Sequence, residues 1–268
     1  MKKKVDKVIR DIKSVKIQGA RNIAKAALSI YSKDKTKKTK SKLISARPTE
    51  PMLVNTLKHF EKLGLKKTLK HFDLAQDKIN KLVYNLIKNK KNLVIFTHCH
   101  STNVVNALIY ARKKGKKFEV YNTETRPLYQ GRKTARELKK AGIKVTMFAD
   151  SAIGLALNKQ QGTKKVDFVF LGADAILKDG AINKIGSGMI AELAKADKIP
   201  VYIIADSWKY SPIHVKIEER KVNEIWNKAP KNIKIRNPAF EKIKPKYITA
   251  IISEKGKLKL KEFIKKVK

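Results

Sequence analysis

The chain has 268 residues, 42% of them hydrophobic, so it is long enough to bury a substantial core in one or two domains. With 12 glycines and 8 prolines, it is neither collagen-like nor disordered as a whole. It carries 63 Lys and Arg against 23 Asp and Glu, a net charge of +40. The lysines are spread along nearly every segment, without interleaved aromatic residues or a nucleic-acid-binding motif, so we expect only non-specific attraction to nucleic acid. A dedicated nucleic-acid partner is the alternative explanation of the charge.

The only cysteine is Cys99, which excludes a disulfide within the chain and fits a reducing compartment. The first fifteen residues are amphipathic and lack the continuous apolar segment of a signal peptide. No apolar run approaches the ~20 residues that a membrane-spanning helix needs. We therefore expect a cytoplasmic protein that does not associate with membranes.

Residues 1–90 are predicted to form an N-terminal helical subdomain. Apolar residues recur at helical spacing over 4–32, with an interruption at Gly19. The same spacing returns over 50–64 and over 72–89, which predicts two further helices.

Two segments of this subdomain are predicted to be irregular. Residues 33–42 are basic and of low complexity, and they contain no core-forming residue, so we expect a solvated linker. Phosphate binding by its lysines is the alternative. Residues 45–49 are expected to form a turn, because Pro48 restricts the backbone.

From residue 91 onward, short apolar runs alternate with helical patterns. The predicted strands are 93–96, 118–121, 143–148, 166–171 and 200–205, with helices at 102–114, 128–141, 151–158 and 184–196 between them. This alternation predicts βαβ units and a parallel sheet. We therefore expect an α/β fold, in which the helical subdomain is followed by a Rossmann-like parallel sheet domain over 91–268. A GxGxxG fingerprint is absent from the sequence, so no dinucleotide is indicated.

Polar and ionisable residues follow all five predicted strands. The segments are 97–103, 122–131, 150–151, 172–174 and 206–209. Ligands of open parallel sheets bind outside the carboxyl ends of the strands. Because all five segments lie at that edge, we expect them to form one functional site.

Two residues of this edge are the candidates for acid–base chemistry. Cys99 lies where a strand gives way to a helix, a position at which the helix dipole lowers a thiol pKa. A small buried core residue is the alternative role for this cysteine. Asp174 follows Gly172 and Ala173, and an aspartate in apolar surroundings keeps its proton and can act as a general acid. A turn or cap aspartate is the alternative for Asp174.

Three segments are candidates for binding anions. Residues 183–188 open the predicted helix 184–196, and a helix N-terminus with a lysine and small residues suits a phosphate. An ordinary capped helix is the alternative there. Residues 19–21 could present main-chain N–H groups to an anion, and Arg47 could offer a planar two-pronged contact. Two separated cationic pockets would suit a bisphosphate.

The histidines do not show a metal-binding pattern. His71, His98, His100 and His214 lack ligand spacing with cysteine or with carboxylates. We therefore expect no metal site.

Several of these segments resemble one known family. They are 97–101, 123–138, Asp150-Ser-Ala152, Gly172-Ala-Asp174 and 182–186. The resemblance is to the alpha, beta and delta subunits of translation initiation factor 2B, a family that also contains methylthioribose-1-phosphate isomerase and archaeal ribose-1,5-bisphosphate isomerase. It covers roughly residues 17–256, and the stretch around Cys99 is most similar to the bisphosphate isomerases.

The resemblance implies a set of site residues. The family's isomerases have a catalytic Cys and a catalytic Asp, which correspond to Cys99 and Asp174. The implied substrate contacts are Gly19, Ala20, Arg21, Arg47, Ser101, Thr102, Asn103, Asn183, Lys184 and Lys209. The family usually has an arginine where this chain has Gln18, and Arg21 lies close enough in sequence to replace it.

The implied reaction is the conversion of ribose 1,5-bisphosphate to ribulose 1,5-bisphosphate in the degradation of AMP. Asp174 would protonate the ring oxygen, and the Cys99 thiolate would remove the C2 proton. No cofactor is needed, AMP is an activator by family analogy, and a homodimer or larger homo-oligomer is implied. A non-catalytic regulatory subunit like those of factor 2B, and a methylthioribose-1-phosphate isomerase, are the alternatives.

Overall fold

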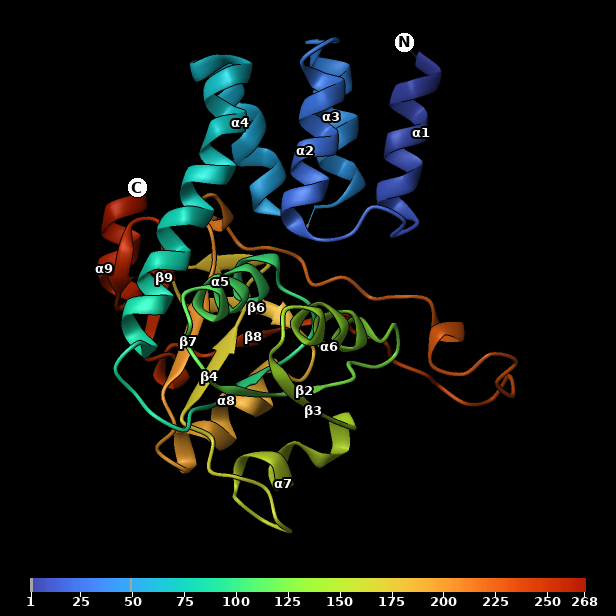
Figure 1. Cartoon of the computed structure of the whole chain (residues 1–268). Coiled ribbons are helices and arrows are strands. Elements are labelled where there is room, and N and C mark those ends of the chain that lie inside the picture. The colour runs from blue at the N-terminus through green and yellow to red at the C-terminus, as the bar shows by residue number, and fades with distance from the viewer. Residues whose placement is uncertain (1, 49) are drawn as a thin grey trace.

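The structure, a computed structural model, describes residues 2–48 and 50–268, so Thr49 of the expected turn lies outside the described residues. The N-terminal part is helical, as predicted (Figure 1). Its helices are α1 (Lys2–Lys13), α2 (Ala20–Tyr31), α3 (Lys37–Ala46) and α4 (Pro51–Ile87). They share one apolar cluster, to which Trp208 from the sheet domain also belongs. The helical part is therefore anchored to the sheet domain through an aromatic side chain.

The helical part differs from the sequence prediction in three places. The linker expected at 33–42 is wrong, because α3 begins at Lys37, where the Thr36 side chain caps it by accepting a hydrogen bond from the Thr39 N–H. Leu43 and Ala46, which are buried, give this basic segment the apolar face that its first half lacks. The turn expected at 45–49 is wrong for Ser45 and Ala46, which belong to α3. Residues 65–71, between the helices predicted at 50–64 and 72–89, are helical as well.

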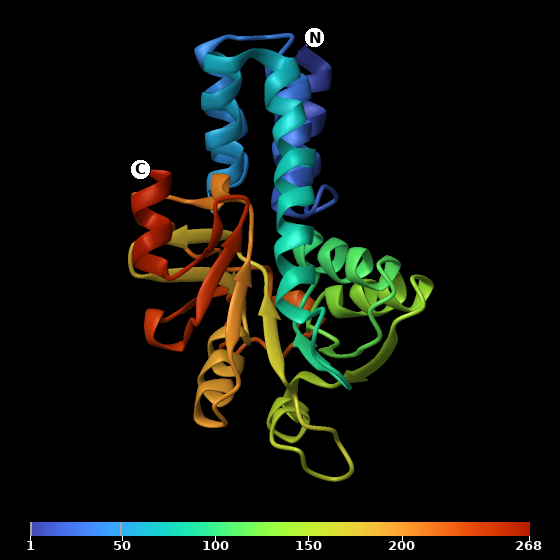
Figure 2. The ribbon, with the colours of Figure 1, turned by 60° about the vertical axis from the view of Figure 1, so that its left-hand side comes forward.

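Gly64 turns α4 back on itself. Its φ of 76° and ψ of 174° are non-helical and lie in a region that favours glycine. Figures 1 and 2 show the result as two arms that run in opposite directions, the second of which reaches down to the sheet. The first arm therefore belongs to the helical part, while the end of the second arm covers the sheet.

The central sheet has seven strands in the order β10-β9-β7-β4-β1-β2-β3. The strands are β1 (Val94–Thr97), β2 (Glu119–Thr123), β3 (Lys144–Phe148), β4 (Phe168–Leu171), β7 (Val201–Ile204), β9 (Ala250–Ser253) and β10 (Gly256–Leu258). All neighbours are parallel except β10, which runs antiparallel to β9. Counted along the chain, the six parallel strands have the doubly wound order 3-2-1-4-5-6, whose direction reverses between β1 and β4. The prediction of a Rossmann-like parallel sheet is confirmed.

Helices cover both faces of this sheet. One face packs against the end of α4, α5 (Thr102–Lys113) and α6 (Gln130–Lys140), and the other against α7 (Ile153–Leu157), α8 (Ser187–Ala196) and α9 (Leu260–Val267). Ile79, Val83 and Ile87 of α4 lie in the core of the first face, so the end of this helix packs with the sheet domain. The domain boundary expected at residue 90 stays a proposal. None of the helices in the described part of the chain is both long and apolar enough to span a bilayer.

A second, smaller sheet was not predicted. It is antiparallel and consists of β5 (Ala175–Leu177), β6 (Gly180–Lys184) and β8 (Phe240–Ile243). The helix expected at 184–196 begins only at Ser187, so Asn183 and Lys184 lie on β6 instead of on a helix N-terminus. Short 3-10 turns complete the fold: η1 (Asp150–Ala152), η2 (Ser207–Lys209), η3 (Val222–Glu224) and η4 (Pro245–Tyr247).

Candidate active site

A cavity of about 110 Å³ lies at the point where the strand order reverses. Cys99 follows the end of β1 by two residues, and Asp174 follows the end of β4 by three, so the two strands that flank the reversal each deliver one candidate residue. This crevice is where open α/β sheets bind their ligands.

The cavity is lined by residues from both the helical part and the sheet domain. They are Val15, Gln18, Gly19, Asn22, Arg47, Glu50, Cys99, His100, Thr102, Leu128, Gln130, Lys133, Asp174, Asn183, Lys184, Arg220 and Phe240. Seven of the twelve residues predicted as catalytic or substrate-binding are among them: Gly19, Arg47, Cys99, Thr102, Asp174, Asn183 and Lys184.

Cys99 is held in place by its backbone. Its φ of 63° is left-handed, its N–H donates to Thr125 Oγ1 at 3.0 Å, and its carbonyl accepts a hydrogen bond from Thr134 Oγ1 at 2.8 Å. The expected lowering of the thiol pKa is wrong. Burial raises the pKa of Cys99 to about 11, against the opposing effect of Lys184, because α5 begins three residues later and the desolvation of the thiolate outweighs that charge.

Asp174 stands at the entrance to the second sheet. Its N–H donates to the carbonyl of Ile182 at 2.8 Å, which fixes the residue at the start of the β5–β6 hairpin. Burial raises the pKa of its carboxyl, although Lys209, Lys184 and Arg47 act against this. The direction agrees with the expectation that this aspartate keeps its proton.

Cationic side chains from two parts of the chain line the cavity. The Lys184 ammonium lies 4.6 Å from the centroid of the Phe240 ring, and the Arg47 guanidinium lies 6.0 Å from the same ring. Arg47 Nη2 also lies 3.2 Å from a Glu218 oxygen, and Glu218 binds Arg220 at 3.2 Å. The cavity wall therefore offers cations near Asp174, an arrangement that suits an anionic ligand.

Five residues implied as substrate contacts lie outside this lining: Ala20, Arg21, Ser101, Asn103 and Lys209. Arg21 pairs with Asp73 at 2.5 Å, whereas Gln18 itself lines the cavity, so Arg21 does not take the place of a cation there.

Ser101 and Asn103, which follow β1 in the chain, make hydrogen bonds within the protein. Ser101 caps α5 by accepting a hydrogen bond from the N–H of Val104. Asn103 is buried, and its side chain donates to Gln76 at 2.9 Å. Substrate contact by these residues stays a prediction.

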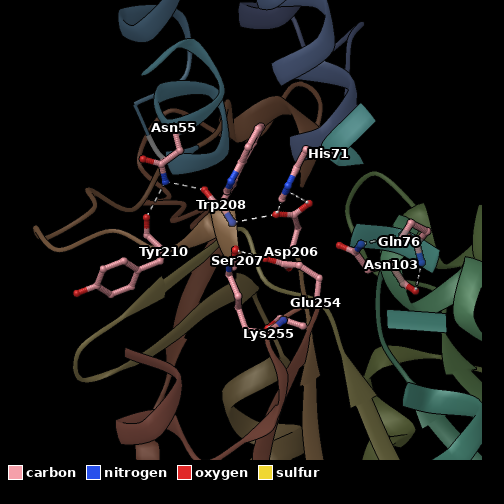
Figure 3. Close-up of polar contacts among 11 residues, drawn as sticks. Asn55, His71, Gln76, Asn103, Asp206, Ser207, Trp208, Tyr210, Glu254 and Lys255 are labelled. Atoms are coloured by element: carbon pink, nitrogen blue, oxygen red, sulfur yellow. Dashed lines mark hydrogen bonds and ion pairs between the residues drawn. The ribbon is translucent and has the colours of Figure 1, made fainter. Parts of the chain in front are cut away.

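Lys209 is buried behind Asp174, and α4 determines its position. Its ammonium donates to the carbonyl of Ala173 at 2.6 Å. Figure 3 shows the Asn55 side chain reaching the carbonyls on either side of this lysine, Trp208 at 2.7 Å and Tyr210 at 2.9 Å. The helical part thereby holds the segment that places a positive charge next to Asp174.

Replacing Asn55 with alanine is expected to loosen this segment. The substitution leaves two backbone carbonyls without their donor, which costs about 1–3 kcal/mol of unfolding free energy. Urea unfolding of Asn55→Ala measures the loss, with Asn227→Ala, an exposed loop residue, as the control. Equal stability of the two variants would contradict a clamp at this position.

A second polar cluster lies beside the segment that carries Lys209. Ligand atoms of His71, Asp206 and Glu254 come within 4.8 Å of one another, the one such group found among residues 2–48 and 50–268. Each has a protein partner: His71 Nε2 lies 3.0 Å from Asp206, which also caps the Trp208 N–H at 2.9 Å, and Glu254 accepts from the Ser207 N–H at 3.0 Å (Figure 3). Sequence spacing missed this group, and its hydrogen bonds explain it without an ion.

Glu50 is the main cavity residue that the sequence did not indicate. Its side chain is 2% exposed, and burial together with the neighbouring Asp174 raises the pKa of its carboxyl to about 8. It precedes α4, far in sequence from the strand ends, and residues of that region were expected to form a turn and a helix. A buried acidic residue at a helix start has no sequence signal that separates it from a cap.

Replacing Glu50 with glutamine is expected to change how stability depends on pH. The folded chain holds the Glu50 proton up to about pH 8, whereas the unfolded chain releases it near 4.5. The folded state therefore binds more protons between these values, and its unfolding free energy falls as pH rises, by at most about 1.4 kcal/mol per pH unit from this group. Denaturant unfolding at several pH values gives the free energy of unfolding of both proteins. Any advantage of wild type over Glu50→Gln in this free energy should narrow or reverse as the pH rises towards 8. A constant difference contradicts the raised pKa.

Comparison with known proteins places the chain among sugar-phosphate isomerases and initiation factor subunits. It is 36% identical to the ribose 1,5-bisphosphate isomerase of Methanocaldococcus jannaschii, over 91% of this chain and 88% of that protein. The ribose 1,5-bisphosphate isomerase of Archaeoglobus fulgidus is 33% identical over 91% of this chain and 86% of its own length. A methylthioribose-1-phosphate isomerase of Geotalea uraniireducens is 37% identical, but over 62% of this chain and 53% of that protein.

Solved structures agree with this placement. The Pyrococcus horikoshii OT3 translation initiation factor eIF-2B superposes with a TM-score of 0.81 at 26% identity, over 95% of this chain and 96% of that one. The 5-methylthioribose 1-phosphate isomerase of the same organism superposes with a TM-score of 0.77 at 25% identity, over 98% of this chain and 87% of that one. The family model for initiation factor 2 subunits matches residues 10–260. The family expected from the motifs is confirmed: the chain belongs to the initiation factor 2 subunit family.

Proposed function

We propose that this chain is an isomerase that converts ribose 1,5-bisphosphate to ribulose 1,5-bisphosphate, with the cavity at the strand reversal as its active site. One observation carries the proposal: Cys99 and Asp174, delivered by β1 and β4, line the same cavity together with Lys184 and Arg47. The archaeal relatives named ribose 1,5-bisphosphate isomerase, which align over most of their length, support it.

The chemistry of the substrate explains why two groups are needed. The C1 oxygen carries a phosphate, so the sugar ring cannot open by loss of a hydroxyl proton. An acid must protonate the ring oxygen as the bond between it and C1 breaks, and a base must take the proton from C2, which leaves an enol. The enol becomes the ketone when the protonated base returns a proton to C1 and the deprotonated acid takes the proton of the C2 hydroxyl. We assign the acid role to Asp174, because burial raises the pKa of its carboxyl, and the base role to Cys99. A partly enclosed cavity that fixes both phosphates would supply positioning worth ~7–11 kcal/mol in favourable cases.

This assignment predicts an unusual pH dependence. Cys99 must lose its proton to act as a base, and burial raises its pKa to about 11, so little of the free protein is in the active form at neutral pH. We expect kcat/KM to rise about tenfold per pH unit from the acidic side, until Asp174 loses the proton that it must donate. Steady-state rates at constant ionic strength measure this. Rates that fall between about pH 5 and about pH 7 contradict Cys99 as the base.

Two substrates and one effector separate the candidate functions. Purified protein is incubated with ribose 1,5-bisphosphate, with and without AMP, and with methylthioribose 1-phosphate. Formation of ribulose 1,5-bisphosphate supports the proposal, and turnover of methylthioribose 1-phosphate alone favours the second isomerase. Failure of both reactions removes the enzyme proposal and leaves a non-catalytic subunit. A rate increase with AMP would establish the activator.

The assembly state and the location of the chain belong to the same proposal. We propose a cytoplasmic homodimer or larger homo-oligomer. One structure with this fold, the tetrameric eIF2B-beta2-delta2 complex of C. thermophilum, supports assembly in general. Light scattering at low and high salt tests it, because a chain of net charge +40 is expected to assemble more readily when its charge is screened.

A further inference from the structure

Two donors or acceptors in the wall of the cavity have no partner. Glu50 Oε2 and Arg47 Nε are buried, and neither has a hydrogen-bond partner among the described residues. Both residues line the cavity. Arg47 contacts Glu218 through both terminal nitrogens, whereas its Nε–H has no partner among the described residues.

Leaving such groups unpaired is unfavourable in a protein interior. A helix cap or an internal ion pair would satisfy the Glu50 carboxyl, but its side chain does not cap α4. Asp174 and Lys184 line the same cavity as Glu50 and Arg47. The missing partner is therefore expected to be a ligand of the cavity.

The charges around Glu50 determine which ligand fits. Asp174 and Glu218 repel a charge on the Glu50 carboxyl, whereas Lys209 and Arg47 attract it. The balance, dominated by burial, keeps Glu50 neutral at pH 7. A neutral carboxyl is an O–H donor, so Glu50 and Arg47 present two donors and no negative charge to the cavity.

We propose that Glu50 is a ligand-contacting residue of this cavity, whose carboxyl donates its proton in a hydrogen bond to a phosphate oxygen of the bound sugar phosphate, beside the N–H of Arg47. Hydrogen bonds from such donors to an anionic oxygen are stronger than neutral ones. The identity of the sugar comes from the proposed function, on which this inference rests. The phosphate is expected because cationic side chains line the cavity. Loss of the proton would place a carboxylate against the phosphate, so binding and protonation of Glu50 are linked.

The linkage can be measured without catalysis. Isothermal titration calorimetry with ribulose 1,5-bisphosphate, and separately with inorganic phosphate, is carried out at about pH 7, 8 and 9 in buffers of different ionisation enthalpy. The proteins are wild type, Glu50→Gln, Glu50→Ala and the exposed control Glu192→Gln. Glutamine keeps an N–H donor but cannot ionise, so it separates the hydrogen bond from the titration.

We expect wild type and Glu192→Gln to take up part of a proton on binding at about pH 9, and to lose up to about tenfold in affinity per pH unit above about 8. Glu50→Gln should bind with less uptake and with a smaller loss of affinity, because only the titration of Asp174 remains, and Glu50→Ala should bind more weakly at every pH. The infrared carbonyl band of a protonated carboxylic acid should weaken in Glu50→Gln.

Three results would overturn the inference: equal proton uptake in wild type and Glu50→Gln, unchanged affinity in Glu50→Ala, or no binding of either probe by wild type. Failure of the isomerase proposal looks different. The protein could bind ribulose 1,5-bisphosphate with proton uptake that depends on Glu50, yet form none of it from ribose 1,5-bisphosphate. That result would support the role of Glu50 and contradict the isomerase activity.

Discussion

Asp174→Asn is expected to lower kcat for ribose 1,5-bisphosphate by about 10²–10⁴-fold, the usual contribution of a positioned general acid. Asparagine has nearly the same shape but cannot give a proton to the ring oxygen. Because the Asp174 N–H, which holds the hairpin to Ile182, is unchanged, the fold should persist. Rates of product formation measure the effect, and Asp179→Asn, which removes an exposed ion pair with Lys242, is the control.

The same loss is expected for Cys99→Ser, since a serine hydroxyl is a much weaker acid than a thiol and does not supply an equivalent base. The double variant should be little worse than either single one, because the two groups act in one reaction. A Cys99→Ser protein with wild-type rates would leave the reaction intact but remove Cys99 as the base. Losses that multiply in the double variant would mean that the two residues act independently.

Gly131→Ala is expected to cause the largest loss of stability. A Cβ at this position would lie 1.7 Å from the carbonyl oxygen of Thr123 and 2.8 Å from its carbon, so the backbone would have to move. The contact joins the start of α6 to the end of β2, and the Asn122 side chain also donates to the Gly131 carbonyl at 2.9 Å. We expect a loss of about 4 kcal/mol or more, in the range that marks severe overpacking.

Gly154→Ala is the matched control, because nothing lies within 4 Å of the Cβ that it adds. It lies in α7, where alanine should stabilise by about 0.5–1 kcal/mol over glycine. Urea unfolding of both variants, followed by circular dichroism, gives the two free energies. Similar effects of the two substitutions would contradict the close approach of α6 to β2.

Much of the fold could be predicted because its signals are local. The runs that form β1, β2, β4 and β7 are buried on both faces, so each appears as a short apolar segment between helical patterns. The second sheet gave no such signal, because β5 has three residues and β6 looks like the approach to α8. Its stability comes from pairing with β8, some sixty residues away in the chain, which no window of sequence reveals.

The candidate site was predictable to the extent that it depends on topology. Residues after β1 and β4 had to lie together once the sheet was parallel, and Cys99 and Asp174 do. Contributions from the helical part depend on how two domains pack, so Glu50 was missed and Arg21 was expected in the wrong surroundings. The pKa of Cys99 was also misjudged, because a strand end indicates the nearby helix but not the depth of burial.

The most direct measurement is the formation of ribulose 1,5-bisphosphate from ribose 1,5-bisphosphate by the purified chain, followed by ³¹P NMR beside Cys99→Ser and Asp174→Asn prepared in the same way. The assay is run with and without AMP. We predict that wild type forms product and that the rate is reduced by at least about 100-fold in each variant. Wild type that forms no product under either condition would contradict the isomerase, and product formed equally by all three proteins would contradict the site.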